Sequence, residues 1–286
     1  MEILDGKLLA AKIRENVAAD AQELKQKTGT VPGLAVLLIG NDPASHVYVN
    51  MKKKACETAK IYSIVHEMPE DISQDAIIDT ITMMNSNPNI DGILVQVPLP
   101  PHIDEVAILE AIAPHKDVDG FHPYNIGRLV AGLDGFVPCT PLGVMKLLEA
   151  YDIDPKGKNA VVVGASNIVG KPMASLLLNA HATVDICHIY TDDLKAHTLK
   201  ADILVVGVGK MNLITEDMVK PDAIVIDIGV NRTSEGKLVG DVDFDAVSAK
   251  SSFITPSPGG VGPMTIAMLL QNTLDSAKKR HLNIEK

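Results

Sequence analysis

The chain has very few aromatic side chains: tryptophan is absent, and aromatic residues make up only 3% of its 286 positions. Its core must therefore be built from aliphatic side chains and methionine. Hydrophobic residues make up 46% and charged residues 22%, which is the composition of an ordinary globular protein. A chain of this length is long for one domain and comfortable for two.

Cysteine is also scarce. The three cysteines, Cys56, Cys139 and Cys187, are far apart and odd in number, and they show none of the short spacings of a zinc site. This argues against a disulfide framework and favours free thiols in a reducing compartment. The histidines show no paired metal spacing either, so we predict no metal site.

The chain lacks the charge and the apolar runs of two other classes of protein. Its formal net charge of −10 argues against nucleic-acid binding, which needs a basic surface to neutralise phosphates. No apolar run reaches the roughly 18 residues of a membrane-spanning helix. The N-terminal segment contains Glu2 and Asp5 and lacks the apolar region of a signal peptide. We therefore expect a cytoplasmic protein without nucleic-acid or membrane partners.

Strand-like and helix-like segments alternate along the chain, a pattern typical of parallel sheets with crossover helices. Short apolar runs that end near glycine or proline predict strands, and longer runs with apolar residues at helical spacing predict helices. The predicted strands span 34–39, 62–66, 93–97, 160–163, 183–187, 203–206 and 224–228, and the predicted helices span 6–27, 45–60, 74–85, 168–179 and 264–279.

Two α/β domains account for this order of segments. The first is predicted to span residues 1–139 and to be completed by 257–286. The second, a Rossmann-type nucleotide-binding domain, is predicted to span 140–256. The length and amphipathic pattern of the C-terminal helix suggest that it packs back against the first domain.

A glycine-containing turn joins a predicted strand to a predicted helix at residues 161–170. Gly164 allows a tight turn, and the helix opens near Gly170, so that backbone N–H groups and the helix dipole would face an anion. The match to a dinucleotide fingerprint is imperfect because Ser166 stands where the middle glycine is usual. A plain strand-to-helix turn is the alternative, but the later strands that end near glycine favour a dinucleotide site.

The second strand of this domain favours NADP over NAD. An NAD site usually has an acid at the end of that strand to hold the ribose hydroxyls, whereas this strand ends in Cys187-His188-Ile189. Asp192 and Asp193 argue the other way, unless they begin the next helix, where acids suit the helix dipole. The candidate partners of a 2′-phosphate are Lys171, His188 and Lys195.

Ser45, Tyr48 and Lys52 share one face of the predicted helix 45–60, because residues three and four positions apart are neighbours on a helix. Lysine can act as an acid or base where burial or a nearby cation favours its neutral form. A solvated basic face is the alternative, since two more lysines follow directly. The stripe of this helix that we predict to be buried, with Lys52 at its edge, consists of Val47, Met51 and Ala55.

Several long blocks of sequence carry a resemblance to one family. They are DPASHVYVNMKKKAC at 42–56, GILVQVPLP at 92–100, KDVDGFHPYNIGRL at 116–129, PCTP at 138–141 and PGGVGPMT at 258–265. In sequence, order and spacing these blocks resemble the bifunctional methylenetetrahydrofolate dehydrogenase/cyclohydrolases. Long blocks in a fixed order are far more specific than a single short motif.

The resemblance implies a catalytic set of four residues. Lys52 would be the acid/base of the cyclohydrolase step, Gln96 would hydrogen-bond near it, and Tyr48 would pack against the folate. Asp119 would bind the pterin ring, since a carboxylate can accept two parallel hydrogen bonds from an amino-pyrimidinone edge. The implied substrate-binding residues are Ser45, Tyr48, Gln96, Pro98, Leu99, Asp119, Pro258, Gly259 and Gly260.

The resemblance also implies an activity. The first domain would bind tetrahydrofolate derivatives and carry catalysis. The enzyme would oxidise 5,10-methylenetetrahydrofolate to the 5,10-methenyl form with NADP+ and hydrolyse that product to 10-formyltetrahydrofolate. This would make it an oxidoreductase and hydrolase of one-carbon metabolism that serves purine, methionine and histidine biosynthesis. The resemblance also implies a homodimer.

The cofactor site departs from part of the family pattern. Ala165 and Ile189 stand where many members have residues that contact the 2′-phosphate, so NAD stays an alternative to NADP. No consequence is attached to Ser257, where valine is usual. Asp227 and Asn231 are predicted either to contact the cofactor or to close a strand turn. The predicted cofactor-binding residues are Thr140, Gly164, Ala165, Ser166, Ile168, Val169, Lys171, His188, Ile189, Gly207, Val208, Gly209, Val230, Gly260, Val261 and Thr265.

Three other functions are weighed against this one. The chain could be a dehydrogenase alone, with Lys52 structural, which a measurement of methenyl hydrolysis would reveal. It could be a silent nucleotide-binding regulator, although the set of Tyr48, Lys52, Gln96 and Asp119 argues against that. It could also be a two-domain dehydrogenase of amino or hydroxy acids, which an assay with methylenetetrahydrofolate would distinguish.

Overall fold

The computed structural model describes residues 1–282 and divides into two compact units. Unit 1 contains residues 1–10, 129–133 and 138–265, and unit 2 contains residues 11–128, 134–137 and the chain from 266 onward. Helix α1 (Gly6–Thr28) and helix α10 (Val261–His281) each begin in unit 1 and continue in unit 2.

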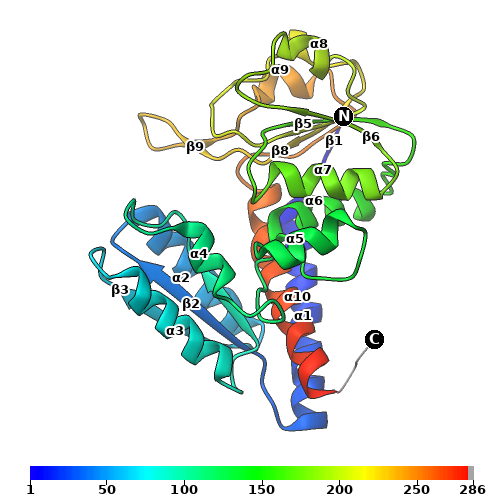
Figure 1. The fold of residues 1–286 in the computed structure, drawn as a ribbon. Coiled ribbons are helices and arrows are strands. Elements are labelled where there is room, and N and C mark those ends of the chain that lie inside the picture. Colours follow the sequence, from blue (N-terminus) through cyan, green and yellow to red (C-terminus); the bar gives the residue numbers. More distant parts are fainter. Residues whose placement is uncertain (283–286) are drawn as a thin grey trace. The chain divides into compact units, whose positions relative to one another are not determined.

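Unit 2 is built around a parallel three-stranded sheet with the strand order β3-β2-β4, of which Figure 1 labels β2 and β3. The central strand β2 (Gly33–Ile39) pairs with β3 (Tyr62–Met68) on one side and with β4 (Gly92–Val95) on the other. Every residue of β2 and β4 is buried. Burial on both faces is the usual condition of a parallel sheet.

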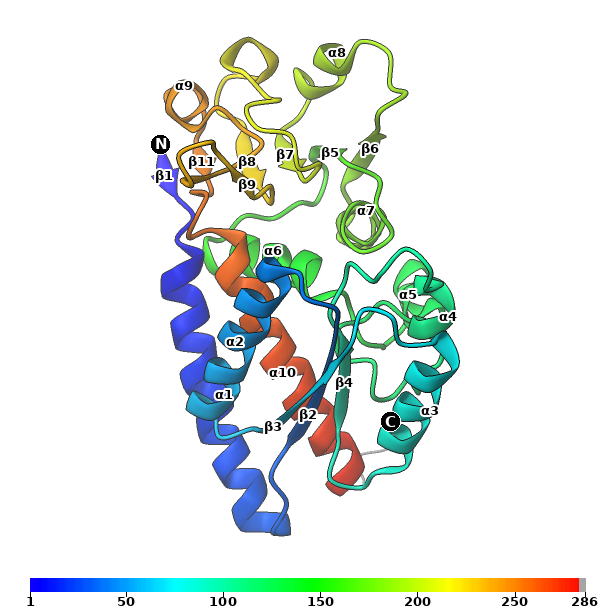
Figure 2. The same ribbon diagram turned by 90° about the vertical axis from the view of Figure 1, so that its left-hand side faces the viewer.

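Helices cover both faces of this sheet (Figure 2). Helices α3 (Gln74–Ser86) and α4 (Glu105–Glu110) share an apolar core with alternate residues of β2 on one face, and α1, α2 (Pro43–Thr58) and α10 lie on the other. Asp42 and Ser73 cap α2 and α3 by accepting backbone N–H groups of the first turn.

Helix α10 is fixed to unit 2 by polar contacts around Asp91, which is fully buried. The Asp91 carboxylate accepts hydrogen bonds from the backbone N–H of Gly33 (2.9 Å) and from Arg280 Nη1 (2.6 Å). The Ser276 hydroxyl on the same helix donates to the Asp91 carbonyl at 2.7 Å. The predicted return of the C-terminal helix to the first domain is confirmed.

Unit 1 contains a six-stranded sheet with the order β1-β11-β8-β7-β5-β6. Every adjacent pair in it is parallel, which confirms the predicted fold class of two α/β domains with parallel sheets. The strands are β1 (Glu2–Ile3), β5 (Asn159–Val163), β6 (Thr183–Cys187), β7 (Ile203–Val206), β8 (Ile224–Asp227) and β11 (Phe253–Ile254).

The remaining elements connect these strands. A short antiparallel hairpin, β9 (Asn231–Arg232) and β10 (Leu238–Val239), follows β8. The helices are α5 (Pro123–Val130), α6 (Cys139–Ala150), α7 (Gly170–Asn179), α8 (Leu194–Thr198), the 3-10 helix η1 (Glu216–Met218) and α9 (Phe244–Ser248).

The strand order of unit 1 creates a topological switch point. From β5 the chain passes to β6 on one side of it, and later returns to β7 on the other side. Open α/β sheets bind ligands where such neighbouring strands end and their connections diverge. In this sheet that point lies at the carboxyl ends of β5 and β7.

The boundaries of several elements agree with the sequence-based expectations. Strands β6 and β7 have the predicted bounds, whereas helix α7 begins two residues later than predicted, at Gly170.

Across residues 1–282, no helix combines the length and apolar character that a membrane span needs. The same residues contain no group of three histidine, cysteine or acidic side chains arranged to hold a metal ion.

Candidate active site

Helix α2 carries the Lys52 side chain into the interior of unit 2, where the residue is only 8% exposed. Its Nζ donates a hydrogen bond to Oε1 of Gln96, which directly follows β4, at 3.0 Å. The Gln96 amide nitrogen donates to the carbonyl of Val97 at 2.8 Å, and this contact turns the amide oxygen toward the lysine. No ion pair of the described residues involves Lys52. The amine is thus buried beside a neutral acceptor.

The face of α2 that is buried differs from the one predicted. It consists of Ser45, Val49, Lys52 and Cys56. The predicted stripe is wrong, because Val47 is 57% and Met51 48% exposed. Both sets have helical spacing, and the side on which the helix meets the rest of unit 2 decides between them. Lys52 therefore lies within the buried stripe, and not at its edge.

The other two predicted site residues of this helix, Tyr48 and Ser45, precede Lys52 by one and two turns. Tyr48 is 40% exposed, and Ser45 is 5% exposed. The backbone N–H of Ser45 donates to the Asp42 carboxylate at 2.7 Å, which fixes the start of the helix. Ser45, Tyr48 and Lys52 thus follow one another on successive turns, with Ser45 and Lys52 buried and Tyr48 partly exposed.

Asp117 organises the turn that carries Asp119. The Asp117 side chain is buried and accepts hydrogen bonds from the backbone N–H groups of Gly120 and Phe121, both at 3.1 Å, and from Asn125 Nδ2 at 2.8 Å. Burial raises the pKa of Asp117, although these hydrogen bonds oppose the shift. Asp119 lies within this turn and is half-buried, so its position depends on Asp117.

Lys116 has a structural role beside this turn. Its side chain is fully buried, and Nζ donates to the carbonyls of Met84 (3.0 Å) and Asn87 (2.8 Å) at the end of α3. Burial lowers the pKa of Lys116 to about 8. Sequence reasoning missed Lys116 and Asp117 as supports of Asp119; their only signal is that they open the block at 116–129.

Two glycine-containing segments meet at the switch point of unit 1. Gly164 has φ of 125°, and a Cβ at this position would lie 2.4 Å from the carbonyl oxygen of Gly207. A Cβ on Gly170 would lie 2.0 Å from the carbonyl oxygen of Gly164. Only glycine permits these approaches. The turn after β5 and the end of β7 are therefore in direct contact.

Ser166, which replaces the usual middle glycine, supports the first turn of α7. Its hydroxyl oxygen accepts hydrogen bonds from the backbone N–H groups of Val169 (3.1 Å) and Gly170 (3.3 Å). Lys171 Nζ donates to the side-chain oxygen of Asn167 at 2.7 Å. The imperfect fingerprint is thus compatible with an ordered turn that presents polar groups.

The end of β6 bears on the choice of cofactor. His188 is exposed and Ile189 is 90% exposed. The Asp193 side chain accepts a backbone N–H of the first turn of α8, so this acid begins the next helix and does not argue for NAD. Lys195 pairs with Asp217 at 2.6 Å. This leaves His188 and Lys171 as the stronger candidates for contact with a 2′-phosphate.

Asp227 and Asn231 close the turn after β8, which is the second of their two predicted alternatives. The Asp227 carboxylate accepts the backbone N–H groups of Gly229 (2.9 Å), Asp241 (3.1 Å) and Val242 (3.0 Å). Asn231 Nδ2 donates to the Asp241 carboxylate at 2.8 Å. Both side chains are therefore engaged within the protein.

Burial raises the pKa of Asp227 to about 6 from its usual 3.8. Between these two values the unfolded chain releases this proton while the folded protein keeps it, so the group's contribution to stability falls as pH rises through that window. Asp227→Asn removes the titration. We expect the unfolding free energy of the wild type, relative to this variant, to fall by about 3 kcal/mol between pH 4 and pH 7.

Urea unfolding of both proteins across this pH range measures the difference. A pH-independent difference between wild type and Asp227→Asn would contradict the assignment. The comparison cancels the titration of the other acids, since both proteins share them.

Further predicted site residues of unit 1 lie in the loop at 258–260 and at Thr140 and Thr265. The hydroxyls of Thr140 and Thr265 lie 2.9 Å apart and are hydrogen-bonded. The Ser257 hydroxyl donates to the carbonyl of Gly229 at 3.0 Å. Ser257, which had no predicted role, thus ties this loop to the end of β8.

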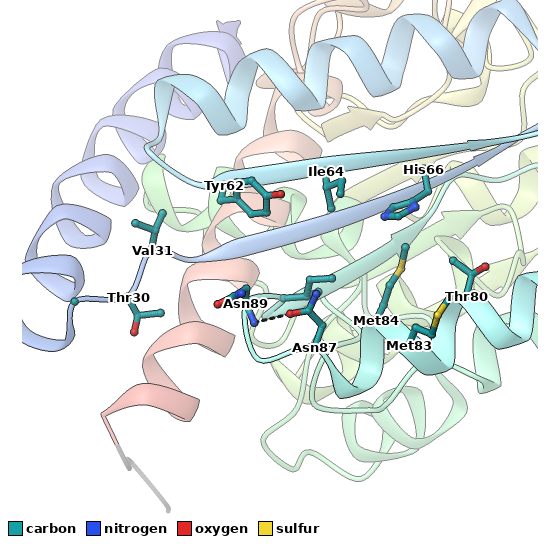
Figure 3. Close-up of a pocket in the computed structure, with 12 residues that line it drawn as sticks. Thr30, Val31, Tyr62, Ile64, His66, Thr80, Met83, Met84, Asn87 and Asn89 are labelled. Carbon is teal, nitrogen blue, oxygen red and sulfur yellow. Dashed lines mark hydrogen bonds between the residues drawn. The ribbon is translucent and has the colours of Figure 1, made fainter.

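A cavity of about 770 Å³ in unit 2 lies apart from these residues (Figure 3). Tyr62, Ile64 and His66 of β3 line one side of it, and Met83 and Met84 of α3 line another. None of the predicted site residues and no lysine, arginine or carboxylate lines it. This cavity is therefore separate from the predicted catalytic residues.

Comparison with known protein families identifies both parts of the chain. Residues 4–119 match the catalytic domain of tetrahydrofolate dehydrogenase/cyclohydrolase, and residues 138–281 match the NAD(P)-binding domain of the same family. The bifunctional protein FolD of Sulfurimonas denitrificans is 70% identical, over 97% of this chain and 98% of that protein.

Solved structures of relatives have the same fold. The bifunctional methylenetetrahydrofolate dehydrogenase/cyclohydrolase of Campylobacter jejuni is 57% identical, with a TM-score of 0.97 over 98% of this chain and 99% of that one. The Trypanosoma brucei enzyme, solved with NADP and an inhibitor, is 36% identical, with a TM-score of 0.93 over 97% of each chain.

Proposed function

The chain belongs to the tetrahydrofolate dehydrogenase/cyclohydrolase family, and we propose that it carries out both reactions for which that family is named. It oxidises 5,10-methylenetetrahydrofolate to the 5,10-methenyl form with NADP+, and it hydrolyses that product to 10-formyltetrahydrofolate. The observation that carries this proposal is the buried amine of Lys52, hydrogen-bonded to Gln96 at 3.0 Å.

Lys52 is the acid/base of the hydrolytic step. The positive charge of the methenyl group disfavours a second cation beside it, which suits Lys52 as a base. It accepts a proton as water adds to the methenyl carbon. The bond from that carbon to N5 then breaks, N5 gains the proton of the new hydroxyl, and the formyl group stays on N10. Gln96 holds the amine in place through its side-chain oxygen.

Asp119 binds the pterin edge of the folate, and Tyr48 packs against it. A carboxylate can accept two parallel hydrogen bonds from the amino-pyrimidinone. The Asp117 turn fixes the Asp119 backbone beforehand, which lowers the cost of ordering the site when substrate binds. Ser45, Gln96, Pro98 and Leu99 are the further substrate contacts that we propose in unit 2.

The residues at the switch point fit a dinucleotide. Gly164 lets the turn after β5 pack directly against Gly207 at the end of β7, and α7 begins beside them at Gly170, where a helix N-terminus can receive a phosphate. When bound, NADP+ accepts the hydride that leaves the methylene carbon. The chain's own contribution is to bind and orient, which supplies much of the acceleration of such a step. Thr140 and Thr265 add a pair of hydroxyls to this site.

A direct assay tests the proposal. Wild-type protein mixed with methylenetetrahydrofolate and NADP+ is expected to form NADPH, and, separately, to hydrolyse added methenyltetrahydrofolate. If the protein formed NADPH without hydrolysing the methenyl compound, it would be a dehydrogenase alone. If it catalysed neither reaction, the proposal would be rejected.

NADP+ is expected to be preferred over NAD+ by at least about ten-fold in kcat/KM, since one charged contact to a 2′-phosphate is worth that much. No acid follows β6 directly, and Asp193 is engaged as a helix cap. Steady-state rates with the two cofactors give the ratio. An NAD+ preference would contradict the assignment of His188 and Lys171 as phosphate partners.

We further propose a cytoplasmic homodimer that serves purine, methionine and histidine biosynthesis. The three cysteines are buried free thiols, which suits a reducing compartment. The dimer and the pathways rest on the family resemblance. The proposed domains are a catalytic folate-binding domain at 1–139, completed by 257–286, and an NAD(P)-binding domain at 140–256.

A further inference from the structure

Asp241 joins the ends of β7 and β8 in unit 1. Its side chain is completely buried. Oδ2 accepts the backbone N–H groups of Val208 (2.7 Å) and Gly209 (3.0 Å), directly after β7. Oδ1 accepts a hydrogen bond from Asn231 Nδ2 (2.8 Å), after β8. One carboxylate thus holds two strand-end segments of the same sheet.

The surrounding backbone is shaped to admit this carboxylate. A Cβ on Gly229 would lie 2.1 Å from the Asp241 Cγ, so only glycine fits at that point of the β8 turn. The Asp241 backbone N–H is held in turn by Asp227 at 3.1 Å. Asp241 is therefore fixed at its backbone and engaged on both oxygens, which is the arrangement of a rigid support.

The segments that Asp241 supports belong to one half of a doubly wound sheet. Strands β5 and β6 lie on one side of the switch point, and β7 and β8 lie on the other. In such sheets the turn after the first strand and the end of the second serve the adenosine half of a dinucleotide. The ends of β7 and β8 are then left for the nicotinamide half. Val208 and Val230, which are 42% and 46% exposed, present this surface.

We propose that Asp241 is a positioning residue for the nicotinamide half of the cofactor, a role that rests on the proposed NADP-dependent function. It does not touch the ligand. It holds the Val208–Gly209 backbone and the turn through Asn231 in the conformation that receives the nicotinamide and its ribose, so that binding needs no ordering of these segments.

Asp241→Asn tests this role. The new asparagine side chain has an oxygen that accepts and an NH2 group that donates, whereas both oxygens of Asp241 accept. In one orientation the NH2 group faces the N–H groups of Val208 and Gly209, and in the other it faces the NH2 group of Asn231. Either way, two donors face each other. We expect the dissociation constant for NADP+ to rise about ten-fold or more. Adenosine 2′,5′-bisphosphate, which lacks the nicotinamide half, should bind within about two-fold of wild type.

Two controls separate positioning from a general loss of fold. Asp243→Asn makes the same chemical change two residues away, at the cap of α9, and should leave both dissociation constants unchanged. Hydrolysis of methenyltetrahydrofolate without cofactor should stay at the wild-type rate in Asp241→Asn. Wild-type NADPH formation is measured first, so that a failure of the proposed function is seen before any variant is interpreted.

The proposal is overturned if Asp241→Asn binds NADP+ as wild type does, or if it loses affinity for NADP+ and for the bisphosphate equally. Should this variant fail to fold, Asn231→Ala removes the Oδ1 partner, together with the hydrogen bond from Asn231 to the Gly240 carbonyl, and decides the question. We expect it to weaken NADP+ binding about three-fold and the bisphosphate not at all, and an unchanged NADP+ affinity would reject the role of Asp241.

Discussion

Lys52→Met is expected to lower the rate of methenyltetrahydrofolate hydrolysis by at least about a hundred-fold, because a positioned acid/base contributes at least that factor. The methionine side chain matches the lysine stem in length, so the buried stripe of α2 stays filled. Formation of NADPH should fall much less, since hydride transfer needs no proton acceptor at this position. The measurement is the rate of each reaction under saturating substrate.

The neighbouring lysines provide matched controls. Lys53 and Lys54 lie on the same helix and are exposed, so Lys53→Met and Lys54→Met should keep both activities. A Lys52→Met protein that hydrolyses the methenyl compound at the wild-type rate would reject Lys52 as the acid/base. Equal losses in both reactions would instead indicate a structural role for the lysine.

Asp119→Ala should raise the KM for methylenetetrahydrofolate by about a hundred-fold. The change removes a charge-assisted pair of hydrogen bonds to the pterin, and such contacts are about twice as strong as neutral ones. The turn should persist, because Asp117 continues to accept the N–H groups of Gly120 and Phe121. The KM for NADP+ should stay within about two-fold of wild type.

Asp117→Ala is the comparison that separates the two acids. Removing this buried carboxylate leaves backbone N–H groups without partners, which costs on the order of several kcal/mol. It should lower the melting temperature more than Asp119→Ala does. An unchanged KM for the folate substrate in Asp119→Ala would contradict the proposed contact between Asp119 and the pterin.

Regular elements could be predicted from local sequence. The bounds of β6 and β7 follow from short β-branched runs between turn residues, and the cap at Ser73 follows from the apolar helical pattern behind it. The pairing of Lys52 with Gln96 could be anticipated only through the resemblance. Their separation of 44 positions in the chain leaves no local signal that they meet.

Long-range and polar features escaped local reasoning. Strand β1 is two residues long and owes its existence to pairing with β11, at the opposite end of the chain. The orientation of α2 depends on what it packs against. The apolar spacing of Val47 and Met51 therefore gave a wrong prediction of the buried face of this helix. Buried acids such as Asp241 cannot be told from surface acids in a sequence. Hydropathy does not record the N–H groups whose hydrogen bonds offset the cost of burying the carboxylate.

A crystal structure with NADP and a folate analogue tests the central claim most directly. We predict that the pterin amino edge lies about 3 Å from the Asp119 carboxylate, with the one-carbon position beside Lys52 Nζ and with Gln96 still bonded to that amine. A folate bound elsewhere, with the Lys52 amine in contact only with protein atoms, would contradict it.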